Sequence, residues 1–420
     1  MSKWKIYTPE GVQDILFEEC YTKREMEEAI RRLFRSCGYY EIETPTIEFY
    51  DTFSAEENLT PQETMFKFFD KQGRILVMRP EATIPVARVA ATKLKDASYP
   101  LRFSYLGNMF RYNELGGGKY NEFTQAGVEI LGISSTEADA EVISTAIQAV
   151  KAAGMQNFQI DIGQVEFFKG LMEESRLSEQ DAEQIRILID RKDYIGIEEL
   201  VKKHDMNSGL KELILELPRL FGSNDVLDRV AKITSNPRSL NALENLRQVL
   251  DILEDAGLGN YVSVDLGMVQ SHNYYTGIIF RGFTYGVGFP ILSGGRYDKL
   301  VEKFGKKCAA TGFSIGINMI MTALERQKAV FAVPKSDTLV CYGKSGRKSA
   351  FEIAGELRRQ GLNVEMDLGF DNMQAARAYA GSKGIGGIVH VLDAGRIELY
   401  NLENGEVTQV TVSELLKNMT

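Results

Sequence analysis

Strand-like segments of this chain are widely separated in the sequence, which limits the folds that it can adopt. Clusters of β-branched, aromatic and alternating residues predict strands at 74–79, 101–112, 122–131, 157–163, 261–267 and 274–289. A stretch with helical periodicity, 165–258, separates the last two from the others. We therefore expect an α+β fold in which a largely antiparallel sheet, flanked by helices, carries a helical insertion.

The length of the chain and a boundary segment that contains a proline predict two domains. A chain of 420 residues is too long for one ordinary core. A long amphipathic helix is expected at 18–38, where Gly38 suits a C-cap. A boundary falls near 327–336, around Pro334. We expect a core fold over 1–330 and a small C-terminal α/β domain over 335–420, with strands at Thr338–Tyr342, Asn363–Met366, Gly387–Val391 and Ile397–Asn401 and helices at Ser349–Gln360 and Asn372–Ser382.

Composition excludes several classes of protein. Hydrophobic residues make up 44% and charged residues 25% of the chain, and no run approaches the roughly 20 apolar residues that span a bilayer. Residues 1–14 lack the apolar region of a signal peptide, so we expect a cytoplasmic protein. The four cysteines, Cys20, Cys37, Cys308 and Cys341, form no CxxC pair, and only three histidines are present. We therefore expect neither a metal site nor another cofactor.

Five sequence blocks occur in a fixed order along most of the chain. They are TPEGVQDI at 8–15, LVMRPEAT at 76–83, FRYNELGGGKYNEFTQAGVE at 110–129, YYTG at 274–277 and GGRYD at 294–298. Together they resemble histidyl-tRNA synthetase, a class II synthetase. The resemblance implies the class II catalytic fold, an antiparallel sheet flanked by helices, followed by a C-terminal domain that is only loosely similar to an anticodon-binding domain.

The resemblance also implies a pocket for free histidine. Such a pocket needs a carboxylate for the ammonium group, a cation for the ligand carboxylate and partners for the imidazole nitrogens. The family positions that hold the amino group correspond to Glu81, Thr83 and Gln125, and those beside the imidazole correspond to Glu129 and Tyr275. Arg111 matches the arginine near the ligand carboxylate, and Tyr274 completes the tyrosine pair.

Each of these residues also has a purely structural interpretation. Glu81 suits the start of a helix, because acidic side chains favour a helix N-terminus. Gln125 and Glu129 share one strand face, where a solvated carboxylate would be unremarkable. The tyrosine pair could belong to the core. The loop Gly116–Gly118 is no P-loop, because Lys119 and Tyr120 follow it instead of Lys-Ser or Lys-Thr and a helix.

Residues that the family uses to activate ATP have been replaced. Adenylate formation needs preorganised positive charge around the attacked phosphorus. The motif FRxE here has Asn113 in place of Glu, the arginine of the RGxDYY block is Gln270, and the arginine that closes the third motif is Met319. Losing one preorganised donor commonly costs on the order of 3 kcal/mol of transition-state stabilisation. We therefore expect no synthetase catalysis.

A retained histidine pocket without ATP chemistry resembles the regulatory subunits of ATP phosphoribosyltransferase. That family implies a non-catalytic subunit in the first step of histidine biosynthesis, which activates a short-form catalytic subunit and transmits feedback inhibition by histidine. It also implies a homodimer within a hetero-octamer of four plus four chains. The alternatives are an active histidyl-tRNA synthetase and a tRNA-binding or amino-acid-sensing module. Residues 331–420 carry ten Lys or Arg and eleven Asp or Glu, a balance that disfavours tRNA contact.

Overall fold

The structure is a computed structural model that describes residues 3–54, 60–113, 116, 119–269, 275–329 and 333–417. The chain divides into two compact units, Met1–Val330 and Phe331–Thr420. In the described residues no helix combines the length and the apolar character that crossing a membrane requires.

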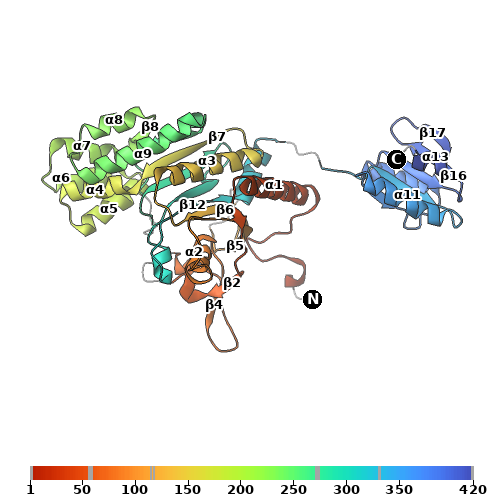
Figure 1. The fold of residues 1–420 in the computed structure, drawn as a ribbon, viewed down its shortest axis with the longest axis horizontal. Coiled ribbons are helices and arrows are strands. Elements are labelled where there is room, and N and C mark those ends of the chain that lie inside the picture. Colours follow the sequence, from red (N-terminus) through yellow and green to blue (C-terminus); the bar gives the residue numbers. More distant parts are fainter. Residues whose placement is uncertain are drawn as a thin grey trace. The chain divides into compact units, whose positions relative to one another are not determined.

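The first unit is built on one large, mostly antiparallel sheet (Figure 1). Its strand order is β1-β5-β6-β12-β11-β10-β7-β9-β8, and only the β1–β5 and β7–β9 pairs are parallel. The strands are β1 (Tyr40–Glu41), β5 (Leu101–Phe110), β6 (Glu122–Leu131), β7 (Phe158–Gln164), β8 (Phe221–Gly222), β9 (Val262–Asp265), β10 (Ile278–Thr284), β11 (Leu292–Arg296) and β12 (Ala310–Gly316). The predicted α+β class is confirmed.

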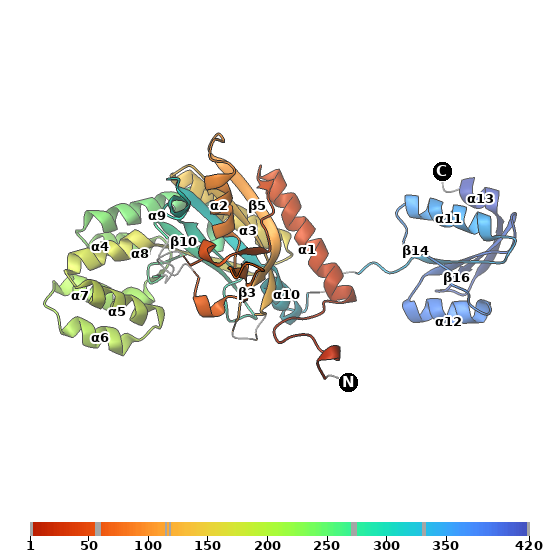
Figure 2. The same cartoon turned by 90° about the horizontal axis from the view of Figure 1, so that it is seen from below.

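Helices cover one face of this sheet (Figures 1 and 2). They are α1 (Phe17–Ser36), α3 (Thr136–Ala152), α9 (Pro237–Asp255) and α10 (Ile317–Arg326). Alternate strand residues such as Val128, Ile130 and Ile162 are buried in one cluster with residues of these helices, as strand periodicity requires. Intervening residues, including Glu129, face the opposite side, where the short helix α2 (Thr83–Thr92) lies.

Helices also fill the long stretch between β7 and β9. Besides α9, they are α4 (Val165–Ser175), α5 (Glu179–Asp190), α6 (Tyr194–Lys202), α7 (Ser208–Glu216) and α8 (Asp225–Ala231). Side-chain caps mark several of these starts: Ser178 accepts from the Asp181 amide, Asp193 from Gly196 and Asn207 from Gly209. Such caps stabilise helix ends by satisfying amides without intrahelical partners. Figure 2 shows α4 to α8 grouped beside the sheet.

Several strand assignments differ from the sequence predictions, and the short strands β3 (Lys67–Phe69) and β8 (Phe221–Gly222) were not predicted. The segment 74–79 does contain β4 (Ile75–Met78), but β4 pairs with β2 (Ile47–Phe49) and β3 (Lys67–Phe69) in a separate small sheet. The strands β11 and β12, which complete the centre of the large sheet, were not predicted. Both are rich in glycine, which has low strand propensity.

The second unit is a small α/β domain with a five-stranded sheet of order β14-β13-β15-β16-β17. The strands are β13 (Thr338–Tyr342), β14 (Val364–Met366), β15 (Gly387–Val391), β16 (Arg396–Asn401) and β17 (Val407–Thr411), and the helices are α11 (Arg347–Arg359), α12 (Met373–Lys383) and α13 (Val412–Lys417). Four strands and two helices match the predicted segments. The exposed edge strand β17 was not predicted.

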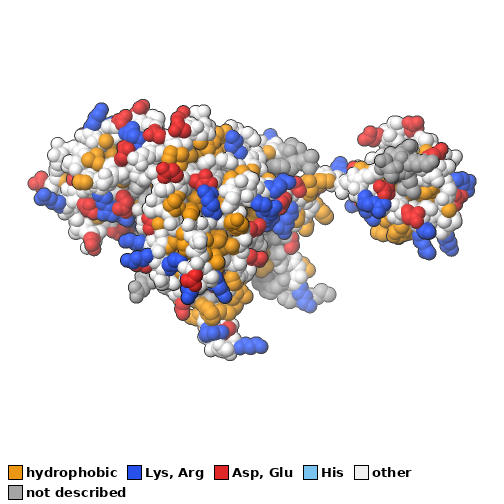
Figure 3. Space-filling model, in the orientation of Figure 1, with side chains coloured by type: hydrophobic (Ala, Val, Ile, Leu, Met, Phe, Trp, Pro, Cys, Tyr) orange, Lys and Arg blue, Asp and Glu red, His pale blue; other side chains and the backbone are white. Residues whose placement is uncertain are grey.

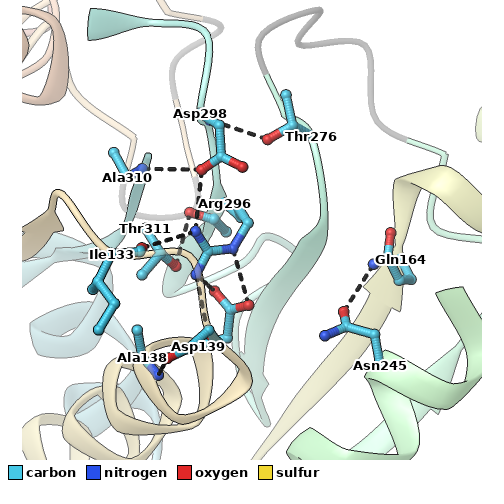
Figure 4. A network of polar contacts seen from close by, with 12 residues as sticks. Ile133, Ala138, Asp139, Gln164, Asn245, Thr276, Arg296, Asp298, Ala310 and Thr311 are labelled. Carbon is cyan, nitrogen blue, oxygen red and sulfur yellow. Dashed lines mark hydrogen bonds and ion pairs between the residues drawn. The ribbon is translucent and has the colours of Figure 1, made fainter. Parts of the chain in front are cut away.

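A buried ion pair joins α3 to the end of β11 (Figure 4). Arg296 lies 2.9 Å from Asp139, and both side chains are almost fully buried. The guanidinium also donates to Asp298 and to the carbonyl oxygens of Ile133 and Ser135. Asp298 accepts from the Ala310 amide, and its own amide donates to Thr276. This network fixes the backbone on both sides of Tyr297.

Replacing Asp139 by Ala should therefore destabilise the first unit. The substitution leaves the Arg296 guanidinium buried without its main counterion, which typically costs about 3–5 kcal/mol. Denaturant unfolding, followed by a probe in the first unit, would measure the loss. Glu137→Ala, at an exposed position in the first turn of the same helix, should cost under about 1 kcal/mol. Equal losses in the two variants would contradict the assigned role.

Candidate functional site

A pocket of about 560 Å³ opens on the face of the sheet opposite α1, α3 and α9. Its walls come from the turn between β4 and α2 and from β6, β10, β11 and β12. Six of the seven predicted site residues are described. All six line this pocket: Glu81, Thr83, Arg111, Gln125, Glu129 and Tyr275. Tyr274 and the replaced position Gln270 lie outside the described residues.

Glu81 stands at the start of α2. Its carboxylate accepts hydrogen bonds from the backbone amides of Ile84 (2.7 Å) and Thr83 (3.2 Å). This is the contact of a helix-start carboxylate, and it holds the group at the pocket wall. Burial raises the pKa of Glu81 to about 7, although these amides and the charge of Arg111 favour the ionised form.

Glu129 lies at the centre of the sheet and is only 1% exposed, so the alternative of a solvated carboxylate is wrong here. Thr83 Oγ1 donates to it over 2.8 Å, and the Tyr297 hydroxyl donates to its other oxygen. Burial raises the pKa of Glu129 to about 8, the two hydroxyl donors lower it, and nearby Glu81 raises it further.

The residue beside Glu129 on β12 must be very small. A Cβ atom at Gly312 would lie 1.7 Å from a Glu129 carboxylate oxygen. Gly295 is similar, because a Cβ there would lie 2.8 Å from the Tyr275 ring. The glycines that weaken the strand signal in the sequence thus provide the space that the Glu129 and Tyr275 side chains occupy.

The remaining predicted residues complete the pocket wall. The Arg111 guanidinium lies 5.0 Å above the Phe123 ring centroid, close enough for a cation–π contact, and its charge acts on Glu81. Gln125 is on β6, four residues before Glu129 and on the same strand face. Tyr275 is 8% exposed. It is therefore both a buried residue and a pocket residue.

The substituted ATP positions now make local structural contacts or offer no charge. The Asn113 side chain donates to the Tyr120 carbonyl (2.7 Å), which helps close the loop before β6. Asn318, directly before the substituted position Met319, accepts from the Thr124 amide (2.8 Å). Met319 lines the pocket with a neutral thioether.

Four further residues in or beside the pocket were not predicted from the sequence. Tyr297, in the GGRYD block, holds Glu129. The buried Tyr105 hydroxyl lies near Glu129, Glu81 and Thr83. Lys119 and Arg281 add positive charge to the lining, and Lys119 lies 3.4 Å from the Phe289 ring centroid. The neighbouring motif could have suggested Tyr297, but no motif marks Arg281.

Among the described residues, no three His, Cys, Asp or Glu side chains are grouped so as to hold an ion.

Comparison with known proteins identifies the family. The sequence model of the histidyl-tRNA synthetase family matches residues 11–320. The ATP phosphoribosyltransferase regulatory subunit of Acetivibrio thermocellus is 68% identical over 417 residues, which cover 99% of this chain and all of that protein. The chain belongs to the ATP phosphoribosyltransferase regulatory subunit family. It is therefore a non-catalytic relative of histidyl-tRNA synthetase with a regulatory role in histidine biosynthesis.

Further relatives agree with this assignment. The ATP phosphoribosyltransferase regulatory subunit of Ruminiclostridium cellulolyticum is 55% identical over 418 residues, which cover 100% of this chain and 100% of that protein. A solved structure from Bacillus halodurans, described as an ATP phosphoribosyltransferase regulatory subunit/histidyl-tRNA synthetase, has a TM-score of 0.83 and 32% identity, covering 93% of this chain and 99% of that one. Histidyl-tRNA synthetase from Nostoc shares the fold, with a TM-score of 0.82, 23% identity and coverage of 99% and 100%.

The raised carboxyl pKa values predict that the stability of this regulatory subunit depends on pH. Between its ordinary pKa of 4.5 and its folded value of about 8, Glu129 binds more protons in the folded state than in the unfolded chain. Its contribution is therefore fully present below about pH 4.5 and is lost as the pH rises to about 8. Glu129→Gln should flatten this part of the pH profile of the unfolding free energy.

Denaturant midpoints at several pH values between 5 and 8 would measure how the pH dependence of stability differs between wild type and Glu129→Gln. Glu137→Gln, on the exposed side of α3, is the matched control and should keep the wild-type slope. Equal slopes for wild type and Glu129→Gln would contradict the raised pKa.

Proposed function

We propose that the pocket binds free histidine as an effector. The observation that carries this proposal is the pairing of two carboxylates, the partly buried Glu81 and the buried Glu129, with the Arg111 guanidinium in one cavity. A zwitterionic amino acid with a second nitrogen-bearing group has complementary charges at these places.

In this proposal each part of histidine has a defined partner. The ammonium group meets Glu81, Thr83 and Gln125, and the ligand carboxylate meets Arg111. The imidazole lies between Glu129 and the described member of the tyrosine pair, Tyr275. Glu129 can serve the ring in either protonation state, because a neutral carboxyl donates a hydrogen bond and an ionised one only accepts. Tyr297 keeps this carboxyl in place.

We further propose that the chain activates a short-form ATP phosphoribosyltransferase catalytic subunit and transmits feedback inhibition by histidine to it. The family and the neutral Met319, at a position where the related synthetases carry an arginine, support this division of labour. By linkage, histidine shifts the quaternary equilibrium only by its differential affinity for the two states. The expected assembly is a hetero-octamer of four regulatory and four catalytic chains.

Self-association would use the region around α1 and the small sheet. Large apolar side chains lie exposed there, by between 42% and 78%: Tyr40, Ile47, Phe49, Phe69 and Ile75. Figure 3 shows apolar side chains over β2 and β4. Because exposed apolar patches mark interaction sites, and two-fold dimers are the commonest oligomers, this surface supports a homodimer.

Histidine should raise the melting temperature of the isolated chain. A ligand at 100 times its Kd stabilises the folded state by about 2.7 kcal/mol. Glu81→Gln, which keeps a hydrogen-bond acceptor for α2 but removes the charge facing the ammonium group, should weaken histidine binding about 10- to 100-fold. Calorimetric titration at pH 8 would measure the histidine affinity of the wild-type chain and of Glu81→Gln, with Glu137→Gln as the matched control. Tight binding by Glu81→Gln would contradict the assigned role of Glu81.

Reconstitution would test the regulatory role directly. Adding the chain to a short-form catalytic subunit should increase phosphoribosyl-ATP formation, and histidine should reverse the increase. The chain alone should show no histidine-dependent ATP–pyrophosphate exchange, because the charges at the family's positions are missing. Robust exchange, or a catalytic subunit that responds neither to the chain nor to histidine, would defeat the proposal.

A further inference from the structure

A second cavity, of about 470 Å³, lies between the helices α4 and α5 and the residues Arg238, Val269 and Tyr275. We call it the insertion groove. Its apolar lining includes Val165, Phe168, Met172, Leu177, Val269 and Tyr275. Phe168 and Met172 are 9% and 8% exposed, so apolar atoms can be reached at its base.

The charged residues of the insertion groove balance one another. Three cations, Lys169, Arg186 and Arg238, and three carboxylates, Glu173, Glu179 and Glu183, contribute to the lining. Each cation already has a carboxylate partner: Lys169 lies 2.9 Å and Arg238 2.5 Å from Glu166, and Arg186 lies 2.6 Å from Glu183. The groove therefore offers no surplus charge to a phosphate or a nucleic acid. It suits an uncharged apolar group that is flanked by polar ones.

Tyr275 lines both the insertion groove and the histidine pocket. The segment that follows it is held from both sides. The Val165 amide, at the start of α4, donates to the Gly277 carbonyl (3.0 Å), and the Thr276 amide donates to the Arg296 carbonyl (2.8 Å). A shift of Tyr275 on ligand binding would therefore act through these hydrogen bonds on both α4 and the end of β11.

We propose that the insertion groove receives an apolar side chain from the ATP phosphoribosyltransferase catalytic subunit, and that Tyr275 couples this contact to the histidine pocket. The inference rests on the proposed function. A subunit without catalytic groups can act only through a surface whose partner affinity depends on the effector, and such coupling requires an element that both sites bias. Tyr275 is an element that both cavities share, and the neutral, apolar groove fits a protein side chain.

The first test fills the groove without touching the pocket. Ala182, on α5, is partly exposed and lines the groove. Ala182→Arg should weaken binding of the catalytic subunit about tenfold or more and reduce its stimulation, while histidine still raises the melting temperature of the variant. Gln184→Arg adds the same side chain to an exposed position of the same helix outside the groove, and it should bind the catalytic subunit like wild type.

The second test measures coupling. Saturating histidine should change the affinity of the wild-type chain for the catalytic subunit by a fixed factor. In Tyr275→Leu, measured at a histidine concentration that saturates the variant, this factor should fall toward one while the complex still forms. An unchanged factor would overturn the role of Tyr275.

The outcomes separate the two proposals. If the wild-type chain neither binds histidine nor stimulates the catalytic subunit, the proposed function fails. If it does both and Ala182→Arg behaves in the same way, only the groove assignment fails. A loss of the homodimer in isolated Ala182→Arg, measured by light scattering, would make the groove a contact between copies of this chain and would also overturn the assignment.

Discussion

The candidate site is organised around the carboxyl group of Glu129, buried in the middle of a nine-stranded sheet. Burying such a group is costly unless its oxygens are hydrogen-bonded. Thr83 and Tyr297 supply the donors, and Gly312 supplies the space. These three residues come from α2, from the end of β11 and from β12, so the carboxyl ties together the elements that form the pocket. The Arg296–Asp139 ion pair supports the same arrangement from the helix side of the sheet.

Positive charge in the pocket comes from Arg111, Lys119 and Arg281. Met319 is neutral at a position where the related synthetases carry an arginine, yet Lys119 and Arg281 both reach the lining. A transition state is stabilised by charges at defined places and not by their number. Cations in other positions can therefore bind an anion without activating ATP. The contacts of Asn113 and Asn318 with the backbone stabilise the loop before β6 and the start of β6.

Regulation by such a chain depends on how closely its sites are joined. The Thr276 amide, directly after Tyr275, donates to the Arg296 carbonyl. The next residue, Gly277, accepts from the amide of Val165, the first residue of α4. Packed interiors respond to displacement by shifting as units, because they contain little free volume. A ligand that repositions this ring would thus alter both the helical region and the end of β11.

The sequence alone determined the class of fold, the helical character of 165–258 and six of the residues that line the pocket. Ordered motifs such as RPEAT and GGRYD carry this information, because they place particular side chains at the ends of particular elements. Local periodicity likewise located α1 and the strands β5, β6 and β7. These features depend on neighbours in the chain and can be read from it.

Only the tertiary structure decided what those residues do to one another. The glycine-rich strands β11 and β12 carry a weak propensity signal, and their place in the sheet follows from the close approach of Glu129 and Tyr275. Contacts between residues far apart in the chain form the separate sheet around β4. They also bring the Tyr297 hydroxyl to Glu129 as a donor and place Arg281 in the pocket. The raised pKa values of Glu81 and Glu129 have the same origin, since burial depends on the assembled fold and not on the local sequence.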